Sequence, residues 1–164
     1  MLRQLILIRH TKSSWKDFSL PDFDRPLKKD RIPDARNMAK KLHALHLKPD
    51  LILCSPAKRT RQTAEYFCEG LGYDFNKVQF DQRIYESSAE EIREVVSEAP
   101  DEVKTLVVVG HNPSLTHFAN MFNGVSVPDF PTTGVAWLEL DADDWNIRSI
   151  TPCKLKWFLT PKMI

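Results

Sequence analysis

Two kinds of apolar pattern, one typical of strands and one typical of helices, take turns along the chain. Short continuous apolar runs, typical of strands covered on both faces, occupy residues 5–8, 51–54 and 106–109. A period-two alternation over residues 135–139 predicts one further strand. Between the runs, apolar residues recur three and four positions apart and predict four helices, over residues 35–45, 57–71, 92–99 and 115–122.

Three of these helices carry start signals. Ser88 and Glu91 have the spacing of a capping box, in which each side chain binds the backbone of the other residue. Ser55-Pro56 and Asn112-Pro113 each offer an N-cap side chain followed by a proline at the first helical position. These signals support helices that alternate with the strands.

The alternation predicts an α/β fold, a three-layer αβα sandwich with a mostly parallel central sheet. In such sheets ligands bind outside the carboxyl ends of the strands. Arg9 and His10 follow the first strand, Arg59 follows the second, and His111 follows a later one. We therefore expect these basic residues at one edge of the sheet.

Length, charge and cysteine content limit the number of domains, the ligand class and the compartment that we expect. A chain of 164 residues with 42% hydrophobic residues fits one domain, residues 1–164, with its own core. Its formal net charge of +1 gives no global signature of binding to nucleic acid or to a membrane surface. The three cysteines are widely spaced and suggest neither a disulfide framework nor a metal site, and no apolar segment is long enough for a signal peptide, so we expect a cytoplasmic protein.

His10 and Arg9 together suit phosphoryl chemistry. A histidine at the end of a rigid strand is held still, and an adjacent arginine can bind a phosphate dianion with two parallel hydrogen bonds. A neutral imidazole, whose usual pKa is about 6.5, is a competent nucleophile toward phosphorus. The alternative for this dipeptide alone is a chance pair at the end of a strand.

Arg59 and His111 also have simpler interpretations when each is taken alone. Arg59 would lie in the first turn of a helix, where the helix dipole favours anions, but it could equally be a surface arginine. His111 follows Gly110, which permits close backbone approach, but it could be a structural histidine. Taken together, two histidines and two arginines at three strand ends predict a positively charged pocket for a transferring phosphoryl group.

Glu86 is the candidate acid that would protonate a leaving group and then activate water. Its alternative is an ordinary solvated loop glutamate. The spacing of His43 and His46 could bring two imidazoles together, but no third metal ligand is evident, and we interpret both as solvated. His117 is interpreted as structural or exposed.

Five motifs, taken in order, resemble the histidine phosphatase superfamily, and within it the small SixA-type phosphohistidine phosphatase branch. The motifs are RHTKSSW, DRPLKK, SPAKRTRQTA, YES and GHNPS. The resemblance covers nearly the whole chain and implies the phosphoglycerate mutase-like αβα sandwich. It identifies His10 as the nucleophile that becomes phosphohistidine.

The resemblance also implies roles for other residues. It assigns Arg9, Arg59 and His111 to the phosphate pocket, Glu86 to the acid, and Ser13 and Arg25 to contacts with phosphate. No cofactor and no metal is implied. The sequence departs from the superfamily at three positions, namely Thr11 and Arg31, where glycine is usual, and Lys16, where the mutase-like branch has asparagine.

The functional hypothesis is a cofactor-independent phosphatase that acts on phosphohistidine in a partner protein such as a histidine phosphotransfer domain. Short connections around the pocket favour an open mouth, which suits a phosphorylated side chain presented by another protein. Two alternatives remain open. One is a small-molecule phosphomonoesterase with the same pocket, and the other is a phosphate-binding module without catalysis.

Overall fold

The computed structural model describes all residues from Met1 to Ile164 and contains a six-stranded sheet. Its strands are β1 (Leu2–Arg9), β2 (Leu51–Cys54), β3 (Gln79–Phe80), β4 (Thr105–Gly110), β5 (Val135–Asp141) and β6 (Cys153–Leu159). Their spatial order is β3-β2-β4-β1-β5-β6. The first four strands in this order pair in parallel, and β5 runs antiparallel to both of its neighbours. The prediction of a mostly parallel sheet is confirmed.

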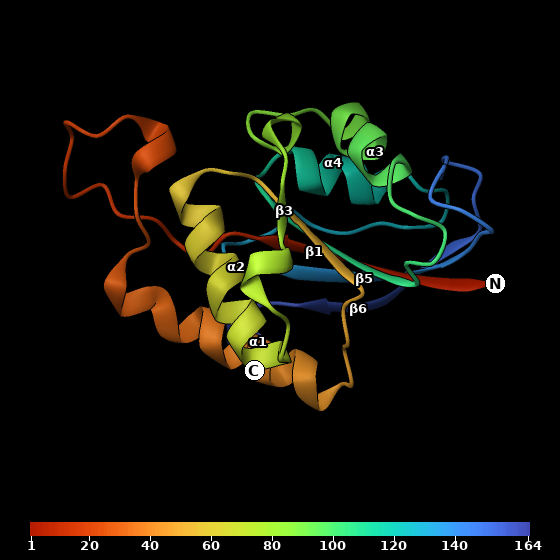
Figure 1. Cartoon of the computed structure of the whole chain (residues 1–164), viewed down its shortest axis with the longest axis horizontal. Coiled ribbons are helices and arrows are strands. Elements are labelled where there is room, and N and C mark those ends of the chain that lie inside the picture. The colour runs from red at the N-terminus through yellow and green to blue at the C-terminus, as the bar shows by residue number, and fades with distance from the viewer.

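Four α-helices cover the two faces of the sheet, namely α1 (Ile32–Ala44), α2 (Lys58–Leu71), α3 (Ala89–Ser97) and α4 (Ser114–Asn120). α1 and α2 lie on one face, and α3 and α4 lie on the other (Figure 1). This is the predicted three-layer sandwich. None of the helices is both long and apolar enough to span a bilayer.

β1 shows why its sequence is a continuous apolar run. Ile6 and Ile8 pack into the core that α1 and α2 close, whereas Leu5 and Leu7 pack into the core under α3 and α4. All four side chains are fully buried. A strand buried on both faces has no polar face, so period-two alternation is lost.

The sequence analysis did not predict the two edge strands, β3 and β6. In β6, the alternation set by Lys154 and Lys156 is interrupted by the apolar run Trp157-Phe158-Leu159. β3 has only two residues, both exposed. Each depends on pairing with a neighbouring strand, which no local pattern encodes.

One of the three helix start signals is confirmed. The Glu91 backbone N–H donates to Ser88 Oγ at 3.2 Å, and the Ser88 N–H donates to the Glu91 carboxylate at 3.1 Å, which completes the capping box. The other two predictions are wrong, because α2 begins only at Lys58 and α4 only at Ser114. The predicted caps Ser55 and Asn112 instead use their side chains in hydrogen bonds beside the cavity described next.

Candidate active site

The register of the parallel strands brings His10, His111 and Ser55 together. β1, β4 and β2 are neighbours, and the residues that follow them leave the sheet at the same edge. The pairing continues past the strand ends, since His10 N–H donates to the Gly110 carbonyl at 3.1 Å and Ser55 N–H donates to the Val109 carbonyl at 3.0 Å. The ring centroids of His10 and His111 are consequently 5.3 Å apart.

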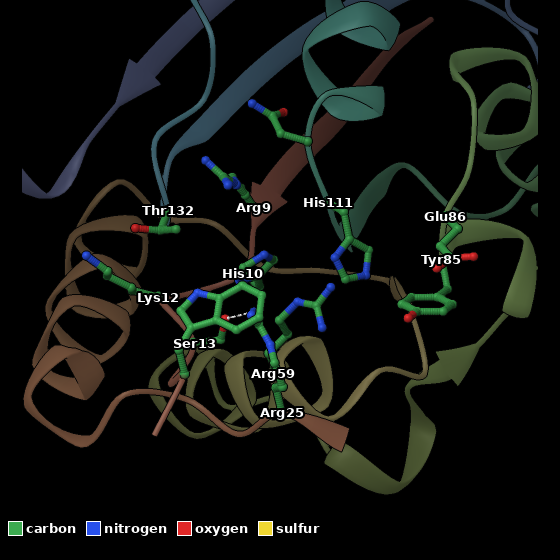
Figure 2. Close-up of a pocket in the computed structure, with 12 residues that line it drawn as sticks. Arg9, His10, Lys12, Ser13, Arg25, Arg59, Tyr85, Glu86, His111 and Thr132 are labelled. Carbon is green, nitrogen blue, oxygen red and sulfur yellow. Dashed lines mark hydrogen bonds between the residues drawn. The ribbon is translucent and has the colours of Figure 1, made fainter. Parts of the chain in front are cut away.

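A cavity of about 390 Å³ opens at this edge. All seven residues that the sequence analysis assigned to the site line it, namely Arg9, His10, Ser13, Arg25, Arg59, Glu86 and His111. In Figure 2 the rings of His10 and His111 and the guanidinium of Arg59 converge on the centre of the cavity. The lining also includes residues that the sequence analysis did not assign to it: Lys12, Trp15, Tyr85, Asn112 and Thr132.

The hydrogen bonds of His10 fix which ring nitrogen carries the proton. Its Nδ1 lies 2.7 Å from the carbonyl oxygen of Thr11. A carbonyl can only accept, so Nδ1 carries the hydrogen and Nε2 of the neutral ring keeps its lone pair. Burial, aided by the charges of Arg59 and Arg9, outweighs this hydrogen bond and lowers the pKa of His10 to about 4. His10 is therefore neutral and nucleophilic at pH 7.

The Thr11 peptide that orients His10 is itself held on several sides. Thr11 N–H donates to Thr63 Oγ1 at 3.0 Å, and the Thr11 hydroxyl shares a 2.8 Å hydrogen bond with the Thr133 hydroxyl. Thr133 N–H donates to the His10 carbonyl at 3.0 Å. The Thr11 side chain is thus buried against Thr133 and is not part of the cavity lining, so the departure from glycine does not narrow the pocket.

His111 is a second buried, neutral imidazole. Its Nε2 lies 2.8 Å from the hydroxyl of Ser55, which also accepts a 3.3 Å hydrogen bond from the Ala57 N–H. Burial and the nearby His10 ring lower the pKa of His111 to about 3. The Ser55 hydroxyl is then well placed to donate to Nε2, an arrangement that leaves the proton of the ring on Nδ1. Ser55-Pro56 suggested a helix cap, and no local signal in the sequence indicated this contact between Ser55 and His111.

The three arginines of the cavity have buried N–H groups without an acceptor in the protein. These are Nε of Arg9, Nε of Arg59, and both Nε and Nη1 of Arg25. Arg25 also donates through Nη2 to the hydroxyl of Ser13, which leaves the hydroxyl hydrogen free to donate to a ligand. Buried cationic donors without acceptors are costly, and oxygens of a phosphoryl group would satisfy them.

Asp22 is a contributor that the sequence analysis missed. It accepts hydrogen bonds from Arg59 through both its carbonyl, at 2.8 Å, and its carboxylate, at 3.0 Å. The Tyr85 hydroxyl donates to the same carboxylate at 2.7 Å. Partial burial would raise the pKa of Asp22, but the bonds from Tyr85 and Arg59 outweigh it and lower the pKa. The ionised Asp22 therefore fixes the orientation of Arg59, a role that no local motif indicates.

Glu86 lies at the exposed rim of the cavity. It stands on the Tyr85 side, across the cavity from Lys12 (Figure 2). Its backbone has a φ of 53°, in the left-handed region that side chains other than glycine rarely adopt. Such conformations persist where the surroundings enforce them and are frequent at functional sites. Its side chain is exposed and lines the mouth of the cavity, where the carboxylate can meet a ligand.

The other singled-out residues lie outside the cavity. His43, His46 and His117 are exposed, and no group of three or more histidine, cysteine or carboxylate side chains is placed to hold a metal ion. Arg31 precedes α1 with a φ of −106°, a conformation that does not require glycine. Lys16 lines a neighbouring groove and not the cavity itself.

The two buried histidines predict a loss of stability in mild acid. Their pKa values are near 4 and 3 in the folded protein, against about 6.5 in the unfolded chain. Between these values the unfolded chain binds more protons, so the free energy of unfolding falls as the pH drops from about 6.5 to about 4. For His10 we expect a loss on the order of 3 kcal/mol, measured by urea denaturation at pH 7 and pH 4.5.

A matched variant separates this effect from general acid denaturation. His10→Asn keeps a side-chain donor near the Thr11 carbonyl but does not titrate, so its stability should change less between the two pH values. The exposed His117→Asn serves as the control and should retain the wild-type pH dependence. Identical pH dependence in all three proteins would contradict the assignment of a buried neutral His10.

Sequence comparisons agree with the geometry of the cavity. A family model described as the histidine phosphatase superfamily (branch 1) matches residues 5–94. An uncharacterized chloroplastic protein of Arabidopsis thaliana is 35% identical over 153 residues, which cover 88% of this chain and 69% of the relative.

Solved structures show the same fold. A candidate phosphohistidine phosphatase SixA from Agrobacterium tumefaciens is 28% identical, with a TM-score of 0.80 over 97% of this chain and 99% of that one. A SixA protein histidine phosphatase in complex with tungstate is 21% identical, with a TM-score of 0.83 over 98% of both chains. The phosphoglycerate mutase-like architecture is thereby confirmed.

Proposed function

The chain belongs to the histidine phosphatase superfamily, in its SixA-type branch, and on this basis we propose that it is a phosphatase that forms a covalent phosphohistidine on His10. We propose that residues 1–164 form a single domain of this family and that the substrate is phosphohistidine in a partner protein. The observation that carries the proposal is the state of His10. Its Nδ1 donates to the Thr11 carbonyl, so the lone pair of its Nε2 is free to attack phosphorus. Buried arginine N–H groups that lack acceptors line the same cavity.

In the first step, the lone pair of His10 Nε2 attacks phosphorus while the bond to the leaving group breaks. The unpaired N–H groups of Arg9, Arg25 and Arg59 receive the equatorial oxygens, whose charge spreads in the transition state. His111 and Ser13 would add neutral donors to the same oxygens. The leaving group departs with a proton, for which Glu86 is the proposed donor.

In the second step, water attacks the phosphoryl group and the bond from phosphorus to Nε2 breaks. Glu86, now ionised, would take the proton from that water, and inorganic phosphate leaves. His10 returns to its neutral form because Nδ1 keeps its hydrogen throughout and donates it to the Thr11 carbonyl. Both steps use only side chains of the protein and water.

The open mouth of the cavity supports a protein substrate. Three side chains at its rim, Lys12, Trp15 and Glu86, are exposed, so a phosphorylated histidine on the surface of another protein can reach His10. Small-molecule enzymes commonly enclose most of the ligand surface. The runner-up, a small-molecule phosphomonoesterase with the same pocket, remains chemically competent.

The function is tested by measuring phosphate release from a histidine-phosphorylated phosphotransfer domain and from a panel of sugar phosphates in parallel. We expect a higher kcat/KM for the phosphorylated domain. A higher kcat/KM for a sugar phosphate would assign the protein to the small-molecule class. Phosphate binding without release from any donor would support the binding module.

Replacement of Glu86 by glutamine should affect substrates unequally. Alkyl phosphates release a strongly basic alkoxide and need the acid, so we expect kcat/KM, which reports phosphoryl transfer to His10 and not the later hydrolysis common to all substrates, to fall about 10²-fold or more. Phosphohistidine can accept a proton from solvent on its second ring nitrogen before its P–N bond breaks, so for this substrate we expect a loss of less than about tenfold. Steady-state kinetics on both substrates give the comparison.

The exposed Glu94 on α3 provides the matched control, since Glu94→Gln makes the same change away from the cavity. Its kinetics should equal those of the wild type. Equal losses by Glu86→Gln on both substrates, or no loss on either, would contradict the role of Glu86 as the acid.

A further inference from the structure

A second groove adjoins the catalytic cavity. It has a volume of about 730 Å³ and is formed by residues 12–17, Leu20 and residues 26–30. It shares Lys12, Ser13 and Trp15 with the cavity, so one ligand can occupy both. We propose that this groove binds an acidic segment of the partner protein next to the phosphorylated histidine. The proposal rests on the proposed function, whose substrate it specifies.

The backbone of the groove is ordered by hydrogen bonds between its two sides. Ser14 N–H donates to the Pro26 carbonyl, and Lys28 N–H donates to the Lys12 carbonyl, each at 2.8 Å. The two sides thus run antiparallel and hold their side chains in a fixed register. In Figure 1 the segment between β1 and α1, which contains both sides, projects beyond the helical layers, where a partner can reach it.

The charge of the groove is strongly positive although that of the whole chain is close to zero. Its lining has four lysines, at positions 12, 16, 28 and 29, against two aspartates. Asp30 is paired with Lys28 at 3.6 Å, and Asp17 accepts hydrogen bonds from Ser19. The remaining cations, Lys12, Lys16 and Lys29, form no ion pair within the protein. An acidic ligand would neutralise them.

The chemistry of the lining favours a polypeptide over a second small phosphate. Compact anions are bound by buried, fixed donors such as those of the catalytic cavity. The groove offers exposed lysines on flexible stems, around apolar surface from the exposed Trp15 and the half-buried Leu20. An apolar centre with a charged rim is typical of protein–protein contacts, in which rim charges steer association.

Trp15 joins the two sites. Its side chain is 63% exposed, yet the guanidinium carbon of Arg25 lies 3.4 Å from the centre of its ring. Arg25 in turn binds Ser13 within the cavity. An exposed tryptophan held in place by a cation is a strong candidate contact for a residue that flanks the phosphorylated histidine.

The test uses two peptides that each carry one phosphohistidine, flanked by glutamates in one and by glutamines in the other. For the wild type at low salt we expect kcat/KM to be about fivefold or more higher for the glutamate peptide. The preference should shrink as added salt screens the charges. In Lys16→Glu/Lys29→Glu the ratio should fall to about one or below, because repulsion replaces attraction.

The matched control is Lys40→Glu/Lys48→Glu, which makes the same change of net charge at exposed lysines outside both sites. It should retain the wild-type preference. Equal kcat/KM for the two peptides in the wild type, or the same preference in both double variants, would overturn the proposal. So would a preference for a sugar bisphosphate over its monophosphate that vanishes in Lys16→Glu/Lys29→Glu, since the groove would then serve a small molecule.

Failure of the groove and failure of the phosphatase assignment give different results. Free phosphohistidine has no flanking residues to fill the groove, so its turnover reports the catalytic cavity. If no phosphohistidine compound is hydrolysed, the proposed function fails. The groove is then judged by the dissociation constants of the two peptides with His10→Ala, where tighter binding of the glutamate peptide supports it and equal binding overturns it.

Discussion

Replacement of His10 by alanine is expected to lower kcat at least about 10⁴-fold on every substrate, the scale seen when a catalytic nucleophile is removed. The hydrogen bond from His10 Nδ1 to the Thr11 carbonyl leaves the lone pair on its Nε2 free at pH 7. The arginine donors remain in the variant, so phosphate binding should persist while turnover is lost. Phosphate release and phosphate affinity are measured on the same preparation.

Detection of the covalent intermediate distinguishes a nucleophilic His10 from a merely structural one. Brief reaction with a ³²P-labelled donor should leave an acid-labile label on the wild type, as expected of a P–N bond, and none on His10→Ala. His10→Asn is a second variant that controls for misfolding, because its side-chain amide can still donate to the Thr11 carbonyl. Turnover near the wild-type level in either variant, or a label that survives in His10→Ala, would refute the mechanism.

Replacement of Arg59 by alanine is expected to lower kcat/KM by about 10²- to 10³-fold, or about 3–4 kcal/mol of transition-state stabilisation. Arg59 lies at the centre of the cavity and keeps a buried Nε hydrogen without an acceptor, while Asp22 fixes its other end. A guanidinium oriented in advance stabilises the spreading charge without reorganisation. The loss should be evident for the phosphoprotein and for small phosphoesters alike.

Arg61 on the same helix is a close control for Arg59. It is exposed and does not line the cavity, so Arg61→Ala should leave kcat/KM within about twofold of the wild type, as is usual for surface substitutions. Arg59→Lys keeps the charge but not the planar fork, and it should recover only part of the activity. Equal kcat/KM values for Arg59→Ala and Arg61→Ala would contradict a role of Arg59 in the reaction.

The orientation of the Arg59 guanidinium depends on Asp22. Its carboxylate binds Arg59 and the Tyr85 hydroxyl at once. Because it lies in the projecting segment between β1 and α1, this contact also ties that segment to the cavity. The proposed groove and the residue that orients Arg59 therefore lie in one segment of the chain.

The layered fold and seven of the twelve residues that line the cavity could be predicted from the sequence. Continuous apolar runs encode strands buried on both faces, as in Leu5 to Ile8, and the helical stripes encode the covering layers. Because parallel strands place their carboxyl ends at one edge, the positions of His10, Arg59 and His111 already implied that they meet. Glu86 was the candidate acid from its place in the chain, the motifs that resemble the superfamily added Ser13 and Arg25, and all three line the cavity.

The protonation and the hydrogen-bond partners of those groups follow from tertiary contacts and not from local patterns. The proton on His10 Nδ1 depends on the position of the Thr11 carbonyl, which Thr63 and Thr133 fix from distant parts of the chain. Ser55 and Asp22 joined the site through contacts 56 and 37 residues away in sequence. Such contacts depend on packing between elements, whereas periodicity and capping signals report only the local environment of each residue.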